Sequence, residues 1–274
     1  MEYSMSLTKL LVLMLNVLVG VAIPLGLYIF LRRKYMCDRR VFLAGCSTMV
    51  AFGLIVDLLV SNVFLPSPAG QFIYTRPWLY GLFSGLVVGL IHEPGRYLCI
   101  RLFLKEERWN DNNALMFGAG YGGMEALAGV LLGSLGNLIV GLMVFRGQHA
   151  FFLEGFTEEG LAEAKQTLDT LCNTSVYGYL MLSVGRCLSA ASQMGLSILV
   201  WFAVKEKESA WKYLGMAMGM HMLLKAGTGI LGGYVSSELL TQLLNAIITA
   251  GILYVAYRVW DREADPPILE TDIE

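Results

Sequence analysis

One apolar segment of this sequence is interrupted by a cluster of ionisable side chains. The run Ile-His-Glu-Pro-Gly-Arg-Tyr, residues 91–97, lies about midway along the segment Trp78–Phe103. On a helix, His92, Glu93 and Arg96 stand at i, i+1 and i+4, so the guanidinium can reach back to either partner. The proline between them removes one backbone donor and is expected to kink the helix, which leaves a carbonyl free beside the carboxylate. Such a group can hold water, form a structural pair or take part in chemistry.

The composition places the chain in a membrane. It is 56% hydrophobic and 15% charged, with a mean hydropathy of +0.59, whereas soluble domains carry roughly 25% charged residues. Charged side chains at bilayer depth cost about 2.5–3.5 kcal/mol each, so they persist where they pair, line a wet cavity or do chemistry. The net charge of −2 argues against a nucleic-acid partner. Five scattered cysteines predict no disulfide framework and no cysteine metal site.

We therefore expect an all-α, polytopic helix bundle in the cell membrane, with residues 1–274 forming a single transmembrane domain. About seven segments are long enough to span: Leu7–Phe30, Val41–Leu65, Trp78–Phe103, Ala114–Phe145, Val176–Val204, Trp211–Leu231 and Leu239–Tyr257. Basic residues gather after the first, third, fifth and seventh segments. The positive-inside rule then puts the N-terminus outside and the C-terminus in the cytoplasm. The first segment is too long for a signal-peptide core and is expected to be retained.

Two polar stretches lie outside the spans. The loop over residues 146–175 is expected on the outer side, and its leucines Leu161, Leu168 and Leu171 recur near helical spacing. This pattern predicts a short amphipathic helix on the membrane surface, whose simplest interpretation is a surface cap. The cytoplasmic tail, residues 261–274, carries two adjacent prolines and several acids, and we expect it to be disordered.

Several ionisable or imidazole side chains lie within the spans, namely Asp57, His92, Glu93, Arg96, Glu125, Arg186, His221 and Lys225. Asp57 and Arg186 both fall in the outer half, and we interpret them as a buried pair that locks two helices. Four polar groups on four helices share another level, about 15–17 Å from the cytoplasmic helix ends at about 1.5 Å per residue. They are Glu93, Glu125, Gln193 and His221. A polar cluster at the midplane is more often a site than a structural pair, so we expect one shared site.

The segment over residues 114–145 contains a glycine run that formally matches G-x-G-x-x-G. A dinucleotide site needs a preceding strand and a soluble βαβ unit, so this match has no such meaning in an apolar span. A small-residue stripe that lets another helix approach closely is formed instead by Gly118, Gly122, Ala126, Gly129 and Gly133. We expect that neighbour to be the helix over residues 78–103, which would bring Glu125 against it.

Taken together, these strings resemble a known family. Glu93-Pro-Gly-Arg96-Tyr97 is followed by Gly118-x-Gly-Tyr-Gly-Gly-Met-Glu125-Ala, then by Arg186 to Gln193-Met-Gly-Leu-Ser197, and later by His221. Motifs in this order resemble those of the YhfC-type membrane peptidases, which are similar in turn to the CAAX-protease and bacteriocin-processing group of glutamic-type intramembrane proteases. The resemblance covers most of the chain. It implies a peptidase that acts on membrane-embedded or membrane-proximal peptides.

The resemblance also implies a mechanism, in which a glutamate takes a proton from the water that attacks the scissile amide. Carried over residue by residue, it makes Glu93 the base, paired with Arg96, and Glu125 the second carboxylate of the site. His221 is the remaining imidazole, and Gln193 could donate to an oxyanion.

This chain departs from the family pattern at three of the site positions. His92, which could serve as a polar partner, stands where such proteins usually show a glutamate, and Tyr121 and Gln193 stand where histidines are expected. Lys225 follows His221 where an Asp or Asn is commoner. The fold implied by the resemblance survives these changes, whereas the activity does not follow from it automatically.

Three functions therefore remain open. The first is an intramembrane peptidase with an altered site, and the second is a protease-like protein that has lost catalysis and binds a membrane partner. A transporter ranks last, because no inverted repeat is visible. Two imidazoles and two carboxylates could hold a metal, but no H-E-x-x-H spacing supports one, so we expect no metal and no cofactor. The expected partners are the lipid bilayer and a transmembrane peptide or protein substrate.

Overall fold

The computed structural model describes residues 3–265, and within them it is helical with no strand. Five helical stretches are long and apolar enough to cross a membrane: Leu7–Tyr35, Arg39–Phe64, Asn113–Phe145, Val176–Lys205 and Glu238–Glu263. Many large apolar side chains are exposed along them, as lipid contact requires. The prediction of an all-α membrane bundle is confirmed. Two further long helical stretches, over residues 77–103 and 210–234, contain the ionisable cluster and His221.

The helices follow one another along the chain as α1 (Leu7–Tyr35), α2 (Arg39–Thr48), α3 (Ile55–Leu59), α4 (Pro68–Tyr74), α5 (Pro77–Val87), α6 (Glu93–Phe103), α7 (Asn113–Gly129), α8 (Leu135–Phe145), α9 (His149–Glu154), α10 (Glu158–Asn173), α11 (Val176–Lys205), α12 (Ala210–Tyr234) and α13 (Glu238–Glu263). Serines begin three of the long ones: the side chains of Ser6, Ser175 and Ser237 each accept a hydrogen bond from a backbone N–H of the first turn. Such caps satisfy donors that the helix itself leaves free.

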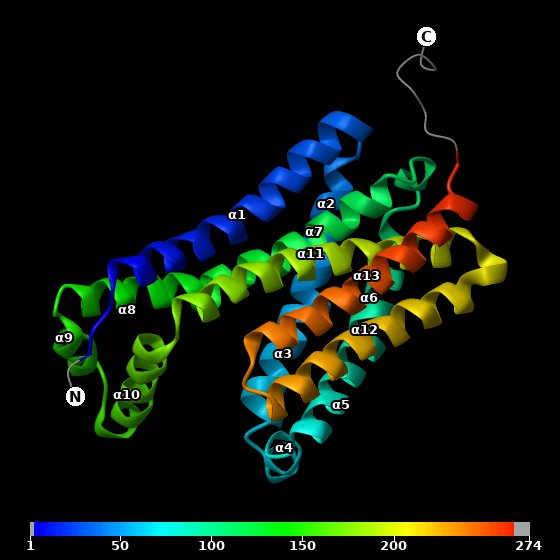
Figure 1. The fold of residues 1–274 in the computed structure, drawn as a ribbon. Coiled ribbons are helices and arrows are strands. Elements are labelled where there is room, and N and C mark those ends of the chain that lie inside the picture. Colours follow the sequence, from blue (N-terminus) through cyan, green and yellow to red (C-terminus); the bar gives the residue numbers. More distant parts are fainter. Residues whose placement is uncertain (1–2, 266–274) are drawn as a thin grey trace.

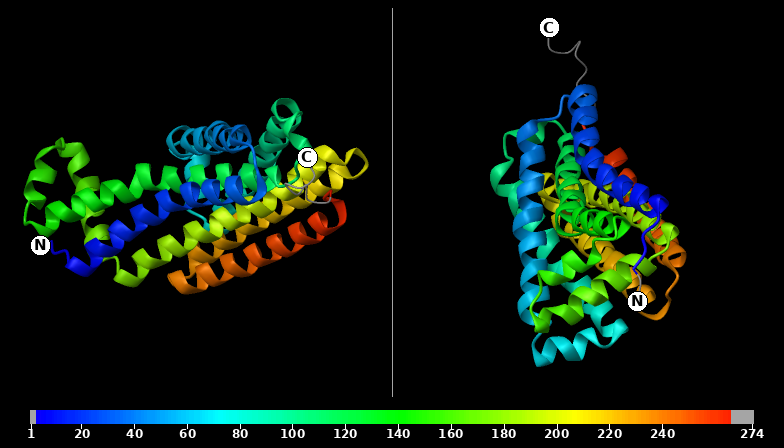
Figure 2. Two further views of the ribbon diagram at one scale, coloured as in Figure 1. Left: turned by 90° about the horizontal axis from the view of Figure 1, so that it is seen from above. Right: turned by 90° about the vertical axis from the view of Figure 1, so that its left-hand side faces the viewer.

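Helix α11 is the centre of the bundle (Figure 1). Its most apolar stretch is 72% buried, against 17% to 28% for the other four candidate spans. Helices α7, α12 and α13 pack directly on it. Helix α2 packs on α7 and lies across the bundle from α13 (Figure 2). A residue that points inward from α6, α7 or α12 therefore meets α11 or a direct neighbour of it.

The small-residue stripe of α7 faces α11. A Cβ added at Gly118 would lie 2.5 Å from the Cα of Met194, and one at Gly122 would lie 2.9 Å from the Cα of Ala190. Only glycine permits backbones this close. The prediction that the stripe packs against the helix over residues 78–103 is therefore wrong, and the close approach brings Glu125 of α7 to α11 instead.

A π-helical turn, Val88–His92, joins α5 to α6 directly before the ionisable cluster. Pro94 follows it in the first turn of α6, where the missing N–H of proline costs least. The wide turn takes up the break in backbone hydrogen bonding, and π-turns of this kind are frequent at functional sites.

The loop over residues 146–175 forms a cap over one end of the bundle. Helix α10 buries Leu168 and Leu171 in a second apolar core that also contains Leu13 and Tyr179. The loop does contain a helix with an apolar face, as expected, but that face covers protein rather than a membrane surface.

The start of the C-terminal tail is ordered, contrary to the prediction of disorder. Helix α13 continues to Glu263, and Asp265 lies 2.6 Å from the ammonium of Lys205. These contacts hold the chain against the end of α11. The remainder of the predicted disordered tail, residues 266–274, lies outside the described residues.

Candidate active site

A buried acid and a buried imidazole meet between α6 and α12. Oε1 of Glu93 lies 2.7 Å from Nδ1 of His221, and both side chains are fully buried. The guanidinium of Arg96, one turn along α6, lies 3.5 Å from the same carboxylate oxygen. A carboxylate buried this deeply requires such compensation, because an unpaired charge at this depth costs several kcal/mol.

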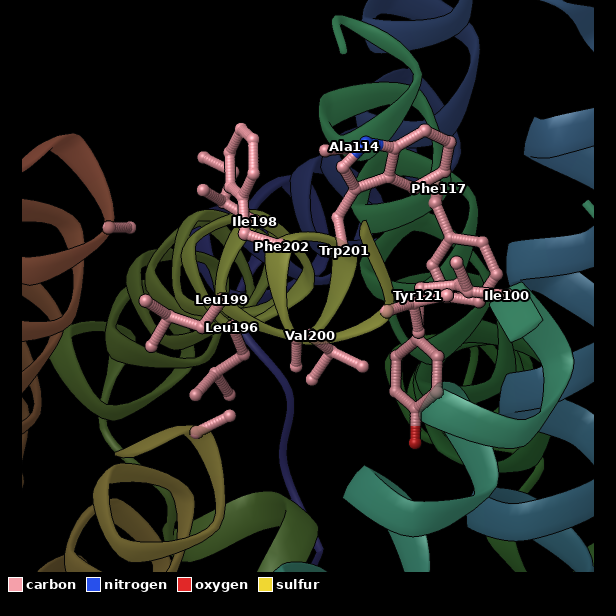
Figure 3. Packing of buried hydrophobic residues seen from close by; sticks show 14 of the residues in the cluster. Ile100, Ala114, Phe117, Tyr121, Leu196, Ile198, Leu199, Val200, Trp201 and Phe202 are labelled. Atoms are coloured by element: carbon pink, nitrogen blue, oxygen red, sulfur yellow. The ribbon is translucent and has the colours of Figure 1, made fainter. Parts of the chain in front are cut away.

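Arg96 joins α6 to α11. Its Nη2 donates to Oε1 of Gln193 at 2.5 Å, and its Nη1 donates to the hydroxyl of Ser197 at 2.9 Å. Its guanidinium also lies 4.1 Å from the ring centre of Tyr121 on α7, a cation–π arrangement. Figure 3 shows the hydroxyl of Tyr121 directed away from the packed side chains of Phe117 and Trp201. The guanidinium of Arg96 thus links α6 to both α7 and α11.

The network continues from Gln193 to Glu125 and then to Lys225. The side-chain amide of Gln193 donates to Oε2 of Glu125 at 2.8 Å. The other oxygen of Glu125 lies 3.7 Å from the ammonium of Lys225 on α12. The side chains of Glu125 and Lys225 are 23% and 42% exposed, in contrast to Glu93 and Arg96. The network is therefore partly exposed at the surface of the bundle where Glu125 meets Lys225.

His92 lies beside His221. The two imidazole rings are 5.8 Å apart between centres, and Nε2 of His92 is 3.9 Å from Oδ1 of Asp57. His92 is buried, whereas the side chain of Asp57 is 58% exposed. The exposed carboxylate of Asp57 is therefore a second point at which the cluster around Glu93 and His221 reaches the surface of the bundle.

The predicted pair between Asp57 and Arg186 is wrong. Arg186 donates to the backbone oxygens of Asn16 and Gly129, at 2.6 and 3.3 Å, and to the hydroxyl of Ser134 at 2.5 Å. These neutral acceptors lie on the helices that pack around α11. They satisfy the guanidinium without a carboxylate.

Five polar atoms around this centre are buried and have no hydrogen-bond partner among residues 3–265. They are Nε2 of His92, Oε2 of Glu93, Nε of Arg96, the hydroxyl of Tyr121 and Nε2 of His221. Buried polar atoms are normally paired, and each unpaired one needs an explanation. These atoms belong to side chains of one cluster, and a water molecule or a polar group of a ligand would satisfy them.

All six predicted site residues belong to this assembly, and direct contacts connect five of them. Glu93, His221, Arg96, Gln193 and Glu125 form one chain of hydrogen bonds and ion pairs, with His92 beside it. Sequence reasoning did not place Ser197 or Asp57 in the site, and it named Tyr121 and Lys225 only as departures from the family pattern. A signal existed for two of them, because Tyr121 and Ser197 stand four residues from Glu125 and Gln193 on the same helix faces.

The comparison with known proteins agrees with these motifs. A model of the YhfC intramembrane metalloproteases matches residues 19–249. The chain is also 30% identical over 239 residues to the uncharacterized membrane protein YhfC of Bacillus subtilis (strain 168). The aligned region covers 82% of this chain and 88% of that protein. The chain belongs to the YhfC family. No solved structure matches it significantly.

Membership of the YhfC family confirms the resemblance to that family and identifies the chain as a multi-pass membrane protein of an intramembrane protease family. The ionisable cluster of α6 and the glycine run of α7 both lie within the matched residues.

The description of the YhfC family as metalloproteases raises the question of whether these residues could hold a metal. A catalytic zinc site takes three protein ligands and keeps one position open. In the part of the chain that the structure describes, no group of three or more His, Cys, Asp or Glu side chains is arranged to hold an ion. Oε1 of Glu93 and Nδ1 of His221 already bind each other, and the positive charge of Arg96 lies beside that carboxylate. The donor set does not fit a catalytic metal.

Proposed function

We propose that this YhfC-family protein is a glutamic-type intramembrane peptidase that hydrolyses an amide bond of a membrane-embedded or membrane-proximal peptide. One observation carries the proposal. Glu93 is fully buried and held through Oε1 by His221 and Arg96, while its other oxygen, Oε2, has no partner within the described chain. A carboxylate fixed at one oxygen and free at the other is suited to take a proton from a positioned water.

In the proposed reaction, a water molecule lies between Oε2 of Glu93 and the scissile carbonyl. Its oxygen bonds to the carbonyl carbon while its proton passes to Oε2, and the carbonyl electron pair moves to the oxygen. The hydroxyl of Tyr121, buried and without a partner in residues 3–265, donates to that oxyanion. When the tetrahedral intermediate collapses, the C–N bond breaks and protonated Glu93 returns the proton to the leaving nitrogen.

The remaining residues of the site position Glu93. Arg96 and His221 hold the carboxylate in place, and Gln193 fixes Arg96 from the opposite helix. Because one hydrogen of the Gln193 amide is engaged by Glu125, we assign Gln193 a positioning role first and oxyanion donation second. The exposed side chain of Asp57 and the partly exposed side chains of Glu125 and Lys225 provide the approach for water and substrate.

A second candidate function rests on the closure of the same network. The carbonyl oxygen of the Gln193 side chain accepts from Arg96 while its amide donates to Glu125, and Glu93 has no exposed surface. A network closed in this way also suits a protease-like protein that has lost catalysis and binds a membrane partner through the exposed residues around it.

Cleavage in reconstituted membranes tests the proposal. The purified chain is placed in liposomes with a panel of transmembrane peptides, beside Glu93→Gln and the exposed control Glu163→Gln. The amide is nearly isosteric with the carboxylate but cannot accept the proton, so we expect about 10³-fold slower cleavage with an unchanged fold, while the control keeps the wild-type rate. Retained cleavage by Glu93→Gln would exclude Glu93 as the base and move that role to Glu125. No cleavage by the wild type would favour the partner-binding protein.

A further inference from the structure

A basic pocket lies where α6 ends and α12 begins, at the end of the bundle that the basic loops predict to be cytoplasmic. It has a volume of about 490 Å³, within the range of ligand sites. Its polar lining consists of Arg101, Lys105, Arg108, Lys207 and the hydroxyl of Tyr97, with no carboxylate among the lining residues. Three of the cations lie within residues 101–108, and Lys207 comes from the turn between α11 and α12, so the fold brings Lys207 to the other three.

The pocket cations differ from three other basic residues at this end of the molecule, which are paired with carboxylates. Elsewhere, Lys205 lies 2.7 Å from Asp111, Arg40 lies 3.0 Å from Glu107, and Arg262 lies 2.7 Å from Glu263. The four pocket cations form no ion pair with any residue that the structure describes. The positive-inside rule explains the sign of these residues but not why four unpaired cations line one pocket that has no carboxylate in its lining.

The neutral contacts of these cations leave most of their donors free. Arg101 donates to the hydroxyl of Tyr97 at 3.1 Å, and Nε of Arg108 donates to the carbonyl of Leu104 at 3.3 Å. Like charges that face one cavity repel one another. An anion with several acceptor oxygens would bind the free donors and remove this repulsion.

We propose that the pocket binds a phosphate-bearing anion, and that this anion is the headgroup of an anionic phospholipid. The rim of the pocket favours a lipid over a soluble phosphate. Trp211, which lines the pocket, is 86% exposed, and Leu98 and Leu102, on the same helix as Arg101, are 46% and 55% exposed. Basic pockets between helices on the cytoplasmic side, bordered by interfacial aromatic residues, bind anionic lipid headgroups in this way.

Titration of the purified full-length chain in neutral detergent tests the proposal. Short-chain phosphatidylglycerol, short-chain phosphatidylcholine, inorganic phosphate and an acidic peptide are each added, and binding is followed by thermal shift and native mass spectrometry. The pocket variant is R101Q/K105Q/K207Q. Its matched control is R33Q/K34Q/R39Q, which removes three charges from exposed residues at the end of α1 and the start of α2. Arg108 is left unchanged because it caps a backbone carbonyl.

We expect phosphatidylglycerol to bind the wild type and the control within a factor of two, and the pocket variant at least tenfold more weakly. Phosphatidylcholine should not bind measurably. Equally weakened lipid binding in the control, or no binding of phosphatidylglycerol by the wild type, would overturn the proposal that the pocket binds this anion. Pocket-dependent binding of inorganic phosphate or of the peptide in place of the lipid would overturn the lipid assignment. If the triple variant does not fold, R101Q and K105Q are measured singly, and each should weaken lipid binding at least threefold.

Discussion

Two arginines lie within the helical bundle, and their surroundings differ. Arg96 is completely buried, shares a carboxylate with His221, and retains a buried Nε without a partner in the described chain. Arg186 is partly buried and donates only to neutral acceptors on α1 and on the α7–α8 stretch. Ser183, one turn away, donates to the side chain of Asn16. No buried atom of the Arg186 cluster, defined as Arg186, Asn16, Ser134 and Ser183, is left unpaired.

The difference separates a structural cluster from a site. A buried polar group left without a partner costs about 1–3 kcal/mol, so a cluster that only stabilises the fold is expected to be satisfied. The Arg186 cluster fits that description, whereas the centre around Glu93 keeps five unsatisfied atoms. Local backbone geometry does not distinguish them, because one π-helical turn ends at His92 and another ends at Ser134. What distinguishes them is whether the polar atoms have partners.

The largest effect in the centre around Glu93 is expected at His221. His221→Ala removes the partner of Oε1 of Glu93 and leaves the carboxylate held by Arg96 alone, so we expect cleavage to fall by about 10²–10³-fold. The measurement is the cleavage rate in liposomes. His149→Ala is the matched control, since this imidazole lies in α9, in the loop over residues 146–175, and should leave the rate unchanged. Comparable loss in both variants would show that the effect is not specific to the site.

The next effect is expected at Arg186, in stability rather than activity. Arg186→Met removes three interhelical hydrogen bonds, and such bonds average about 0.6 kcal/mol each in membranes, so we expect the free energy of unfolding to fall by about 2 kcal/mol. Unfolding in mixed micelles measures the loss. The folded variant should cleave substrate at the wild-type rate, and a loss of turnover without loss of stability would place Arg186 in a functional site.

The same comparison shows what could be predicted from the sequence. Hydropathy predicts the all-α membrane bundle, and the rise per residue predicts that Glu93, Glu125, Gln193 and His221 share one depth. The rotation of each helix about its axis is not predictable in this way. Asp57 lies between the π-helical turns Met49–Leu54 and Val60–Phe64, and each such turn rotates the side chains that follow it relative to a regular helix. The sequence therefore predicts Arg186 as the partner of Asp57, whereas the structure places His92 beside it.

Which helices pack against one another is also not predictable from the sequence. The stripe on α7 predicts that some backbone approaches closely, but the identity of that backbone depends on how all the helices pack. The structure brings α11 to Gly118 and Gly122. This choice places Gln193 between Arg96 and Glu125, and no spacing within a single helix indicates that bridge.

A smaller effect is expected at the Gln193 bridge. Gln193→Leu keeps a side chain of similar size but removes the link between Arg96 and Glu125, so Arg96 holds Glu93 less firmly. We expect kcat to fall about tenfold with KM within a factor of two, as for a loss confined to the transition state. Steady-state kinetics in liposomes measure the two constants. Ser183→Ala, a polar deletion in the Arg186 cluster, should change neither, and a rise in KM alone for Gln193→Leu would contradict the positioning role.

The smallest expected effect is that of metal removal, and it tests the difference between this site and a metal centre. The charge beside Glu93 is supplied by Arg96 at 3.5 Å, and the described chain offers no set of three ligands. We therefore expect 1,10-phenanthroline to leave the cleavage rate within a factor of two, and elemental analysis of the purified protein to find far less than one zinc per chain. Phenanthroline is needed because it removes zinc from buried sites, and its non-chelating isomer controls for effects on the membrane. Inactivation by phenanthroline that added zinc reverses would show that Glu93 and His221 separate to admit an ion, and would replace the glutamic mechanism with a metal-dependent one.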